Sequence, residues 1–184
     1  MIIETIFSTM DQAGKPNFAP MGLVWGEEIV IVRPFRNTQT CRNLISGGFG
    51  VASLSDDVLA YVKSGLYDAA LPGFAAIRIP GIVFQGACSW LELAVISESG
   101  SEDRAEFQCR IMHRAYGRDF LGFCRAGNAV IEATILATRL DFYSRKEVDE
   151  SLKRYSRIIE KTAGQNEKEA FQLVCDYVRQ REEQ

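Results

Sequence analysis

Arginine, threonine and asparagine side chains gather in one short stretch of this sequence, in an order that suits an anion site. The stretch ends a predicted strand at Arg33 and opens a predicted helix with Thr38 and Thr40, before Asn43. Amides at a helix N-terminus point at an anion, hydroxyls donate to it, and an arginine can bind phosphate through two hydrogen bonds. The simpler alternative is a helix cap at Thr38 and a solvated strand end at Arg33. Taken alone, the stretch favours that alternative.

The strand before this stretch gives the anion-site interpretation further support. Residues 17–22 read Asn-Phe-Ala-Pro-Met-Gly, and Pro20 can donate no ladder hydrogen bond, so the strand should lie at an edge or contain a bulge. A flavin ring needs backbone N–H groups at its N5 and O4 atoms. The amides of Met21 or Gly22 could supply them, although the same residues could equally form a structural bulge. A flavin is favoured because this strand is followed directly by the stretch that suits a phosphate.

These residues are expected to be held by strands in the first half of the chain and by helices in the second. Strands are expected at 2–10, 18–25, 29–32, 49–54, 82–98 and 106–114, with short helices at 38–46 and near 58–62 and a loop at 65–80. From residue 128 the apolar period becomes helical, and three helices follow. The fold class is therefore α+β. We expect a barrel-like domain at 1–125 and helices at 126–184 packed on it.

Composition excludes several classes of protein. The chain has 184 residues, 47% of them apolar, and a net charge of −3, so it is globular and has no field that would attract nucleic acid. No signal peptide and no membrane span are expected, and the location is expected to be cytoplasmic. Five separated cysteines and one histidine predict neither a disulfide framework nor a metal site.

Other chemistry-bearing residues have simpler interpretations. Asp56 and Asp57 are expected to cap a helix rather than to act as a carboxylate pair. His113 is expected at a surface or interface, and Glu132 in a buried ion pair with Arg125 or Arg139. The sequence has no nucleophile–base motif, no dinucleotide fingerprint and no Walker loop, so no catalytic residue is assigned. A flavin enzyme needs none of these, because the cofactor carries out the redox chemistry.

Three motifs, in this order, resemble those of one known family. They are the Asn17–Gly22 strand, the Arg33–Leu44 segment, and the stretch from Gly122-Phe123-Cys124-Arg125-Ala126 through Glu132 to Leu140. Together they are similar to the domain of unknown function numbered four-four-seven, found in archaea and in bacteria that handle one-carbon units. The resemblance covers most of residues 2–160.

The resemblance implies a split β-barrel, mainly antiparallel, of the flavin reductase and pyridoxamine-phosphate-oxidase type. It implies a homodimer with FMN at the subunit interface. Carried over residue by residue, it implies that Asn17, Ala19, Pro20, Met21 and Gly22 line the flavin ring. Arg33, Thr38, Thr40 and Asn43 would hold the phosphate, with Phe35 and Ser53 counted among the cofactor-binding residues. Ser53 and Cys124 stand where asparagine is usual in the family.

The function implied is an FMN-dependent oxidoreductase or electron-transfer protein, linked by analogy to pterin-dependent one-carbon metabolism. The alternative is a non-catalytic flavin-binding or scaffold module whose site has degenerated. The electron partner is not specified by the residues. Dimerisation is expected for a second reason: the large side chains Trp25, Phe84, Trp90 and Phe107 would need cover in an incomplete barrel.

Overall fold

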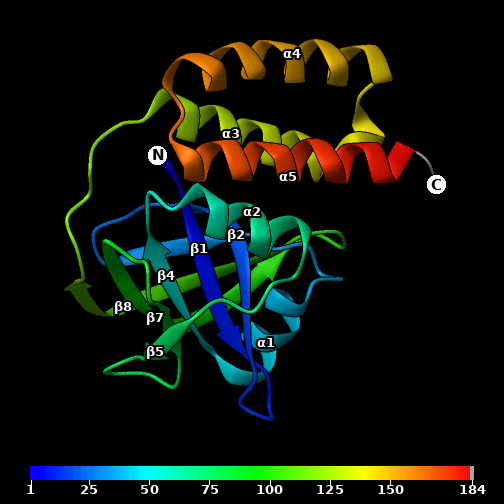
Figure 1. Cartoon of the computed structure of the whole chain (residues 1–184). Coiled ribbons are helices and arrows are strands. Elements are labelled where there is room, and N and C mark those ends of the chain that lie inside the picture. The colour runs from blue at the N-terminus through cyan, green and yellow to red at the C-terminus, as the bar shows by residue number, and fades with distance from the viewer. Residues whose placement is uncertain (183–184) are drawn as a thin grey trace. The chain divides into compact units, whose positions relative to one another are not determined.

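The structure of the chain, a computed structural model, describes residues 1–182 (Figure 1). Its contacts divide it into two compact units. The first is a barrel unit made of Met1–Ser55 and Asp68–Phe120. The second is a helical unit made of Asp56–Tyr67 and the chain from Leu121 onward. The short helix near residue 60 thus belongs with the C-terminal helices, although it is encoded within the first half of the sequence.

The barrel unit is a closed antiparallel barrel with the strand order β1-β2-β3-β8-β7-β4. Its strands are β1 (Ile2–Met10), β2 (Pro16–Val24), β3 (Ile29–Val32), β4 (Phe49–Leu54), β7 (Ser89–Gly100) and β8 (Ala105–Tyr116). Alternate residues point inward, so that Phe7, Leu23 and Phe107 fill the barrel and are almost completely buried. The helix α1 (Gln39–Gly47) connects β3 to β4 in this unit.

The expected strand at 82–98 is in fact two strands. β6 (Ile82–Phe84) pairs with β5 (Gly73–Ala75) in a small separate sheet, and β7 begins only at Ser89. A turn separates them, in which the amide of Ala87 donates to the carbonyl of Phe84 at 3.1 Å. A Cβ at Gly86 would lie 2.6 Å from the ring of Phe84, so a larger residue there would have to displace this buried ring. The expected loop at 65–80 likewise contains β5.

The helical unit consists of four α-helices and one 3-10 turn within the described residues. These are α2 (Val58–Leu66), α3 (Arg125–Ala137), η1 (Leu140–Phe142), α4 (Arg145–Thr162) and α5 (Gln165–Glu182). Their apolar faces form one core, which includes Val62, Val130 and Val174, all of them fully buried. As expected, Asp57 caps α2 by accepting from the amide of Ala60 at 3.0 Å.

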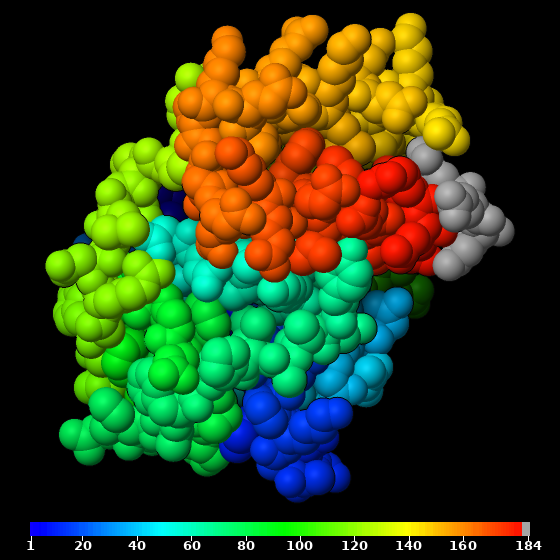
Figure 2. All heavy atoms as spheres, viewed as in Figure 1, coloured from blue at the N-terminus to red at the C-terminus, as the bar shows by residue number. Residues whose placement is uncertain are grey.

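Helix α4 carries its charged side chains on its solvent face, and side chains of this helix project from the surface in Figure 2. Oppositely charged residues pair at i,i+4, as with Arg145 and Asp149. Its first turn is fixed by a reciprocal capping box between Ser144 and Glu147. This is the solvated face that alternating charges predict. No helix of the described residues is long and apolar enough to cross a membrane.

Two expectations about buried groups are wrong. Phe84, Trp90 and Phe107 are covered by the chain itself, with 3%, 6% and 1% of their surface exposed, so they need no partner subunit. Glu132 is exposed on α3 and forms no ion pair with any residue of the described chain. Glu132 is surrounded by apolar residues in the sequence because most faces of α3 are buried, and Glu132 lies on the exposed face of this helix.

Candidate functional site

Strand β2 has one paired edge and one edge that is mostly open. It pairs with β1 along its whole length, from Met10 opposite Pro16 to Ile2 opposite Val24. On its other side only Leu23 and Val24 pair with β3. Residues 16–22 therefore have no strand partner on this side within the described chain, and we call this open edge of β2 the split of the barrel. Pro20 lies in this part, as its missing N–H predicted.

Strand alternation decides which β2 amide faces the open edge. Just past the end of β2, the amide of Trp25 donates at 2.9 Å to the carbonyl of Met1, the residue before β1. Because amides along a strand point alternately to its two sides, the amide of Met21 also faces β1, whereas that of Gly22 faces the opposite edge. Pro20, next in that row, has no N–H. Of the two amides suggested by the sequence, Gly22 supplies the one at the split.

The packing of β2 against β1 also favours glycine at position 22. A Cβ there would lie 2.8 Å from Oε1 of Glu4 and 3.0 Å from Cγ2 of Ile2, its neighbours on β1. A larger residue would have to displace these side chains. Ala19 and Met21 are half-buried, and Met21 packs partly against the barrel core.

The N-terminus of α1 is the second part of the candidate site. Thr38 caps the helix: its hydroxyl oxygen accepts from the amide of Cys41 at 3.3 Å and the hydroxyl donates to the carbonyl of Phe35 at 2.7 Å. The next two amides, of Gln39 and Thr40, donate to no acceptor among residues 1–182. A helix N-terminus carries a partial positive charge, so these two amides can bind an anion.

Hydrogen bonds between side chains connect α1 to the first two strands. The Asn17 amide donates from Nδ2 to Oγ1 of Thr40 at 3.2 Å, and Nδ2 of Asn43 donates to Oγ1 of Thr9 at 3.0 Å. Gln39 donates in turn to Oδ1 of Asn43 at 2.6 Å. The predicted residues Asn17, Thr40 and Asn43 thus lie together. Asn43 is 2% exposed, and its amide is engaged inside the protein, so it positions the helix.

The arginines of this region are bound to other protein groups. Arg33 forms a 2.7 Å ion pair with Glu106, and Arg36 forms a 2.8 Å ion pair with Glu98. Both carboxylates come from the β7–β8 hairpin, which docks on the segment after β3. The exposed ring of Phe35 stacks under Arg104 of the same hairpin, 4.0 Å from its guanidinium carbon.

Arg42 was not a predicted site residue, yet it reaches the helix N-terminus. Its Nη1 donates to the carbonyl of Asn37 at 2.8 Å, and the same guanidinium donates to the side chain of Gln39. Its position in the sequence could have indicated this, because residue 42 lies one turn after the cap at residue 38, on the same helix face.

Ser53 is not brought into this group. It lies on β4, opposite Ile6, and Ile6 lies opposite Pro20, so two strand steps separate Ser53 from β2. The side chain is fully buried, and its hydroxyl oxygen accepts from the amide of Phe84 at 3.2 Å. In this structure Ser53 anchors β6 to the barrel.

A second polar cluster in the barrel unit was not predicted from the sequence. The fully buried carboxylate of Glu92 accepts from the amides of Ile77 at 2.8 Å and Arg78 at 2.6 Å, and from the indole of Trp90 at 3.3 Å. Burial opposes its ionisation, but these hydrogen bonds and the nearby His113 outweigh burial and hold the pKa of Glu92 below its ordinary value. Glu92 fixes the loop before β6.

Comparison with solved structures identifies the architecture. An FMN-bound protein from Methanosarcina mazei is 23% identical and superposes with a TM-score of 0.82, covering 96% of this chain and 94% of its own. A flavoredoxin from Methanosarcina acetivorans matches at 13% identity and a TM-score of 0.57, over 66% of this chain and 72% of its own. At these identities the likeness establishes the fold, which is the expected split β-barrel of flavin reductase-like proteins with added helices.

A third similar structure is the flavin reductase of the styrene monooxygenase from Pseudomonas putida S12. It is 17% identical, with a TM-score of 0.54, over 62% of this chain and 80% of its own. Among family models, the N-terminal domain of a protein family of unknown function, DUF447, matches residues 3–118, and the DUF447 C-terminal model matches residues 124–176. Since these two matches span most of the sequence, the chain belongs to the DUF447 family.

Proposed function

We propose that this protein binds FMN at the split of its barrel and acts as an oxidoreductase or electron-transfer protein. The observation that carries the proposal is one juxtaposition. The open edge of β2, with the Gly22 amide, and the N-terminus of α1, with the Gln39 and Thr40 amides, are joined by the hydrogen bond from Asn17 to Thr40. Donors for a planar ring edge and for an anion thus come from two elements that this hydrogen bond joins.

The residues present fit such a cofactor. The Gly22 amide would donate to the edge of the flavin ring, and its missing side chain leaves the backbone accessible. The Gln39 and Thr40 amides would donate to the phosphate, supported by the dipole of α1. When bound, FMN supplies hydride or single-electron chemistry, and the chain supplies position and electrostatics. The FMN-bound relative from Methanosarcina mazei supports this choice of cofactor.

The test is to purify the full-length protein and titrate it with FMN, riboflavin and FAD, following flavin fluorescence. Losing the phosphate removes hydrogen bonds to a charged group, each contributing about 1.5–3 kcal/mol, so riboflavin should bind at least about tenfold more weakly than FMN. Equal affinities would show that no phosphate is held at α1. Absence of any flavin binding would overturn the proposal as a whole.

Turnover is tested separately by adding NADH or NADPH without oxygen to the FMN-loaded protein. Bleaching of the flavin absorbance in one of these reactions would support a reductase. A protein that binds FMN but is bleached by neither, and by no added reduced electron carrier, would support the binding-module alternative. A pterin-related substrate is proposed by family analogy alone, and reoxidation of the reduced flavin by an oxidised pterin tests it.

We also propose that the protein is a homodimer. The barrel unit leaves several large apolar side chains exposed on strands and their ends. Ile2 is 64% exposed, Met112 48% and Tyr116 86%. Exposed apolar surface of this kind is typical of a subunit interface.

A further inference from the structure

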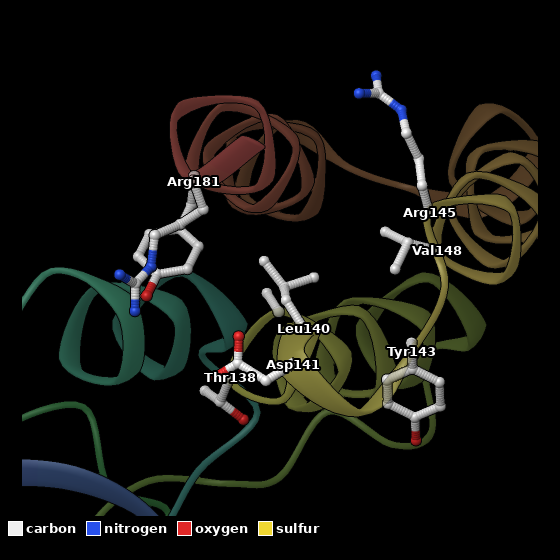
Figure 3. A pocket seen from close by; sticks show the side chains of 9 residues that line it. Thr138, Leu140, Asp141, Tyr143, Arg145, Val148 and Arg181 are labelled. Atoms are coloured by element: carbon white, nitrogen blue, oxygen red, sulfur yellow. The ribbon is translucent and has the colours of Figure 1, made fainter. Parts of the chain in front are cut away.

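The helical unit contains a hollow with a volume of about 350 Å³, which is not used by the proposed flavin site. It lies where the end of α3, the turn η1, the start of α4 and the end of α5 meet (Figure 3). The residues that line it are Ala137, Thr138, Leu140, Asp141, Tyr143, Arg145, Val148, Tyr177 and Arg181. This volume is at the lower end of the range for small-molecule sites, so the hollow suits a small ligand.

One cation at this hollow has no anionic partner among the side chains that the structure describes. Arg181 stacks on the ring of Tyr177, with its guanidinium carbon 5.8 Å from the ring centroid, and pairs with no carboxylate of residues 1–181. Arg179, two residues earlier on α5, is instead bound to Asp176. The tyrosine ring holds the Arg181 guanidinium beside the hollow without neutralising its charge. A ligand carboxylate would find two or more N–H donors there.

An anion lines the same hollow and likewise has no partner among the described side chains. Asp141, in η1, forms neither an ion pair nor a side-chain hydrogen bond with the part of the chain that is described, and it does not pair with Arg181. Thr138 lies next to it at the C-terminal end of α3, where the helix dipole is negative. Carboxylate and dipole together favour a ligand ammonium group. Arg145, the other lining cation, points away from Asp141 in Figure 3 and pairs with Asp149.

The remaining lining is apolar. Ala137 and Val148 are each 3% exposed and belong to the core of the helical unit, and Leu140 packs against that core. An apolar group placed on this surface would remove it from water. The hollow therefore offers a positive group, a negative group and an apolar wall that are separate from one another.

We infer that this hollow binds a small zwitterion of the amino-acid type. Arg181 takes the carboxylate, Asp141 and the C-terminal end of α3 take the ammonium, and the wall of Ala137, Leu140 and Val148 takes an apolar side chain. A ligand with only a negative charge would be repelled by Asp141, and a ligand with only a positive charge would be repelled by Arg181. Only a ligand with both charges satisfies the two groups.

The experiment is calorimetric titration of the full-length protein with L-leucine, L-methionine and L-phenylalanine. Saturable binding of at least one is expected. The best of them is then compared with its amide, which has no carboxylate, and with its N-acetyl derivative, which has no ammonium. Each derivative should bind at least about fivefold more weakly. Failure of all three amino acids to bind, or derivatives that bind as well as the parent, would overturn the inference.

Two variants test which charged group of the ligand each of the two residues binds. Arg181→Gln should bind the amino acid and its amide equally, and Asp141→Asn should bind the amino acid and its N-acetyl derivative equally. Arg179→Gln is the matched control, because this arginine is on the same helix but is paired with Asp176. It should leave all affinities unchanged. Equal losses in Arg179→Gln and Arg181→Gln would indicate a general charge effect and would refute the assigned site.

Discussion

Replacement of Glu92 by glutamine tests how the barrel unit holds the loop before β6. In the native protein one fully buried carboxylate accepts from two consecutive backbone amides and one indole. Hydrogen bonds to a charged group contribute about 1.5–3 kcal/mol each. Glutamine keeps one acceptor oxygen but turns an NH2 group toward one of the amides. The variant should therefore lose about one such bond, or roughly 2–3 kcal/mol of unfolding free energy, in addition to weakening the other bonds.

Urea denaturation of both proteins near neutral pH, followed by tryptophan fluorescence, measures this difference. The exposed Glu102→Gln variant is the control and should change the unfolding free energy by no more than about 0.5 kcal/mol. The reasoning is refuted if Glu92→Gln falls within that same limit, since a buried carboxylate with three donors could not then be a major stabilising contact.

The pH dependence of the same pair gives an independent check. The pKa of Glu92 is lowered in the folded protein, so its stabilisation is complete above the unfolded-state pKa of about 4.3 and is lost as the pH falls through the lower folded-state pKa. Glutamine does not titrate. The stability difference between native protein and variant should therefore narrow in this acidic window, by at most about 1.4 kcal/mol per pH unit. A difference that stays constant down to acid unfolding would contradict the assigned pKa direction.

The remaining predictions concern the proposed site, the assembly and the cysteines. Glu106→Gln should tighten FMN binding, by up to about 1 kcal/mol in a fluorescence titration, because it frees Arg33 and removes a negative charge; weaker binding would place the phosphate elsewhere. Asn43→Leu should lower the unfolding free energy by about 1–3 kcal/mol, measured in urea, because Thr9 is left buried without its donor; an unchanged midpoint would contradict that role. Light scattering should give twice the 20.6 kDa chain mass, and a monomer at micromolar concentration would exclude the dimer. Exposed Cys124 should react first with a thiol reagent and Cys109 last, because burial raises the pKa of Cys109 to about 12; equal rates in the folded protein would contradict the burial.

Local sequence signals predicted the elements that carry the candidate site. Thr38 is the cap of α1, and Gly48 ends that helix in the left-handed conformation, because both functions depend on residues adjacent in the chain. Pro20 marked the open part of β2, since a missing N–H excludes regular pairing on one side. The family motifs added the barrel type, which the comparisons confirm.

Long-range partners could not be predicted in this way. Nothing near Glu92 in the sequence indicates that its carboxylate oxygens accept from the amides of Ile77 and Arg78, which are 15 and 14 positions earlier. Likewise, Arg33 reads as a free cation at a strand end, because Glu106 lies 73 positions away. Such pairings arise from strand register and hairpin docking, and these depend on the whole barrel rather than on a local pattern.

The pairing of Arg33 changes how the proposed phosphate site must work. An arginine that already holds a carboxylate at 2.7 Å can contribute to a phosphate only by sharing or exchanging that partner. The pair is exposed to solvent, where exchange costs little, so Arg33 acts as an adjustable rather than a fixed contact. The Gln39 and Thr40 amides, in contrast, are held by the helix and have no partner to release among the described residues. Preorganised donors contribute more to affinity than donors that must first be freed. The helix N-terminus is therefore expected to provide most of the binding energy for the phosphate. Arg42 lies beside this terminus, and Arg33 is expected to contribute least.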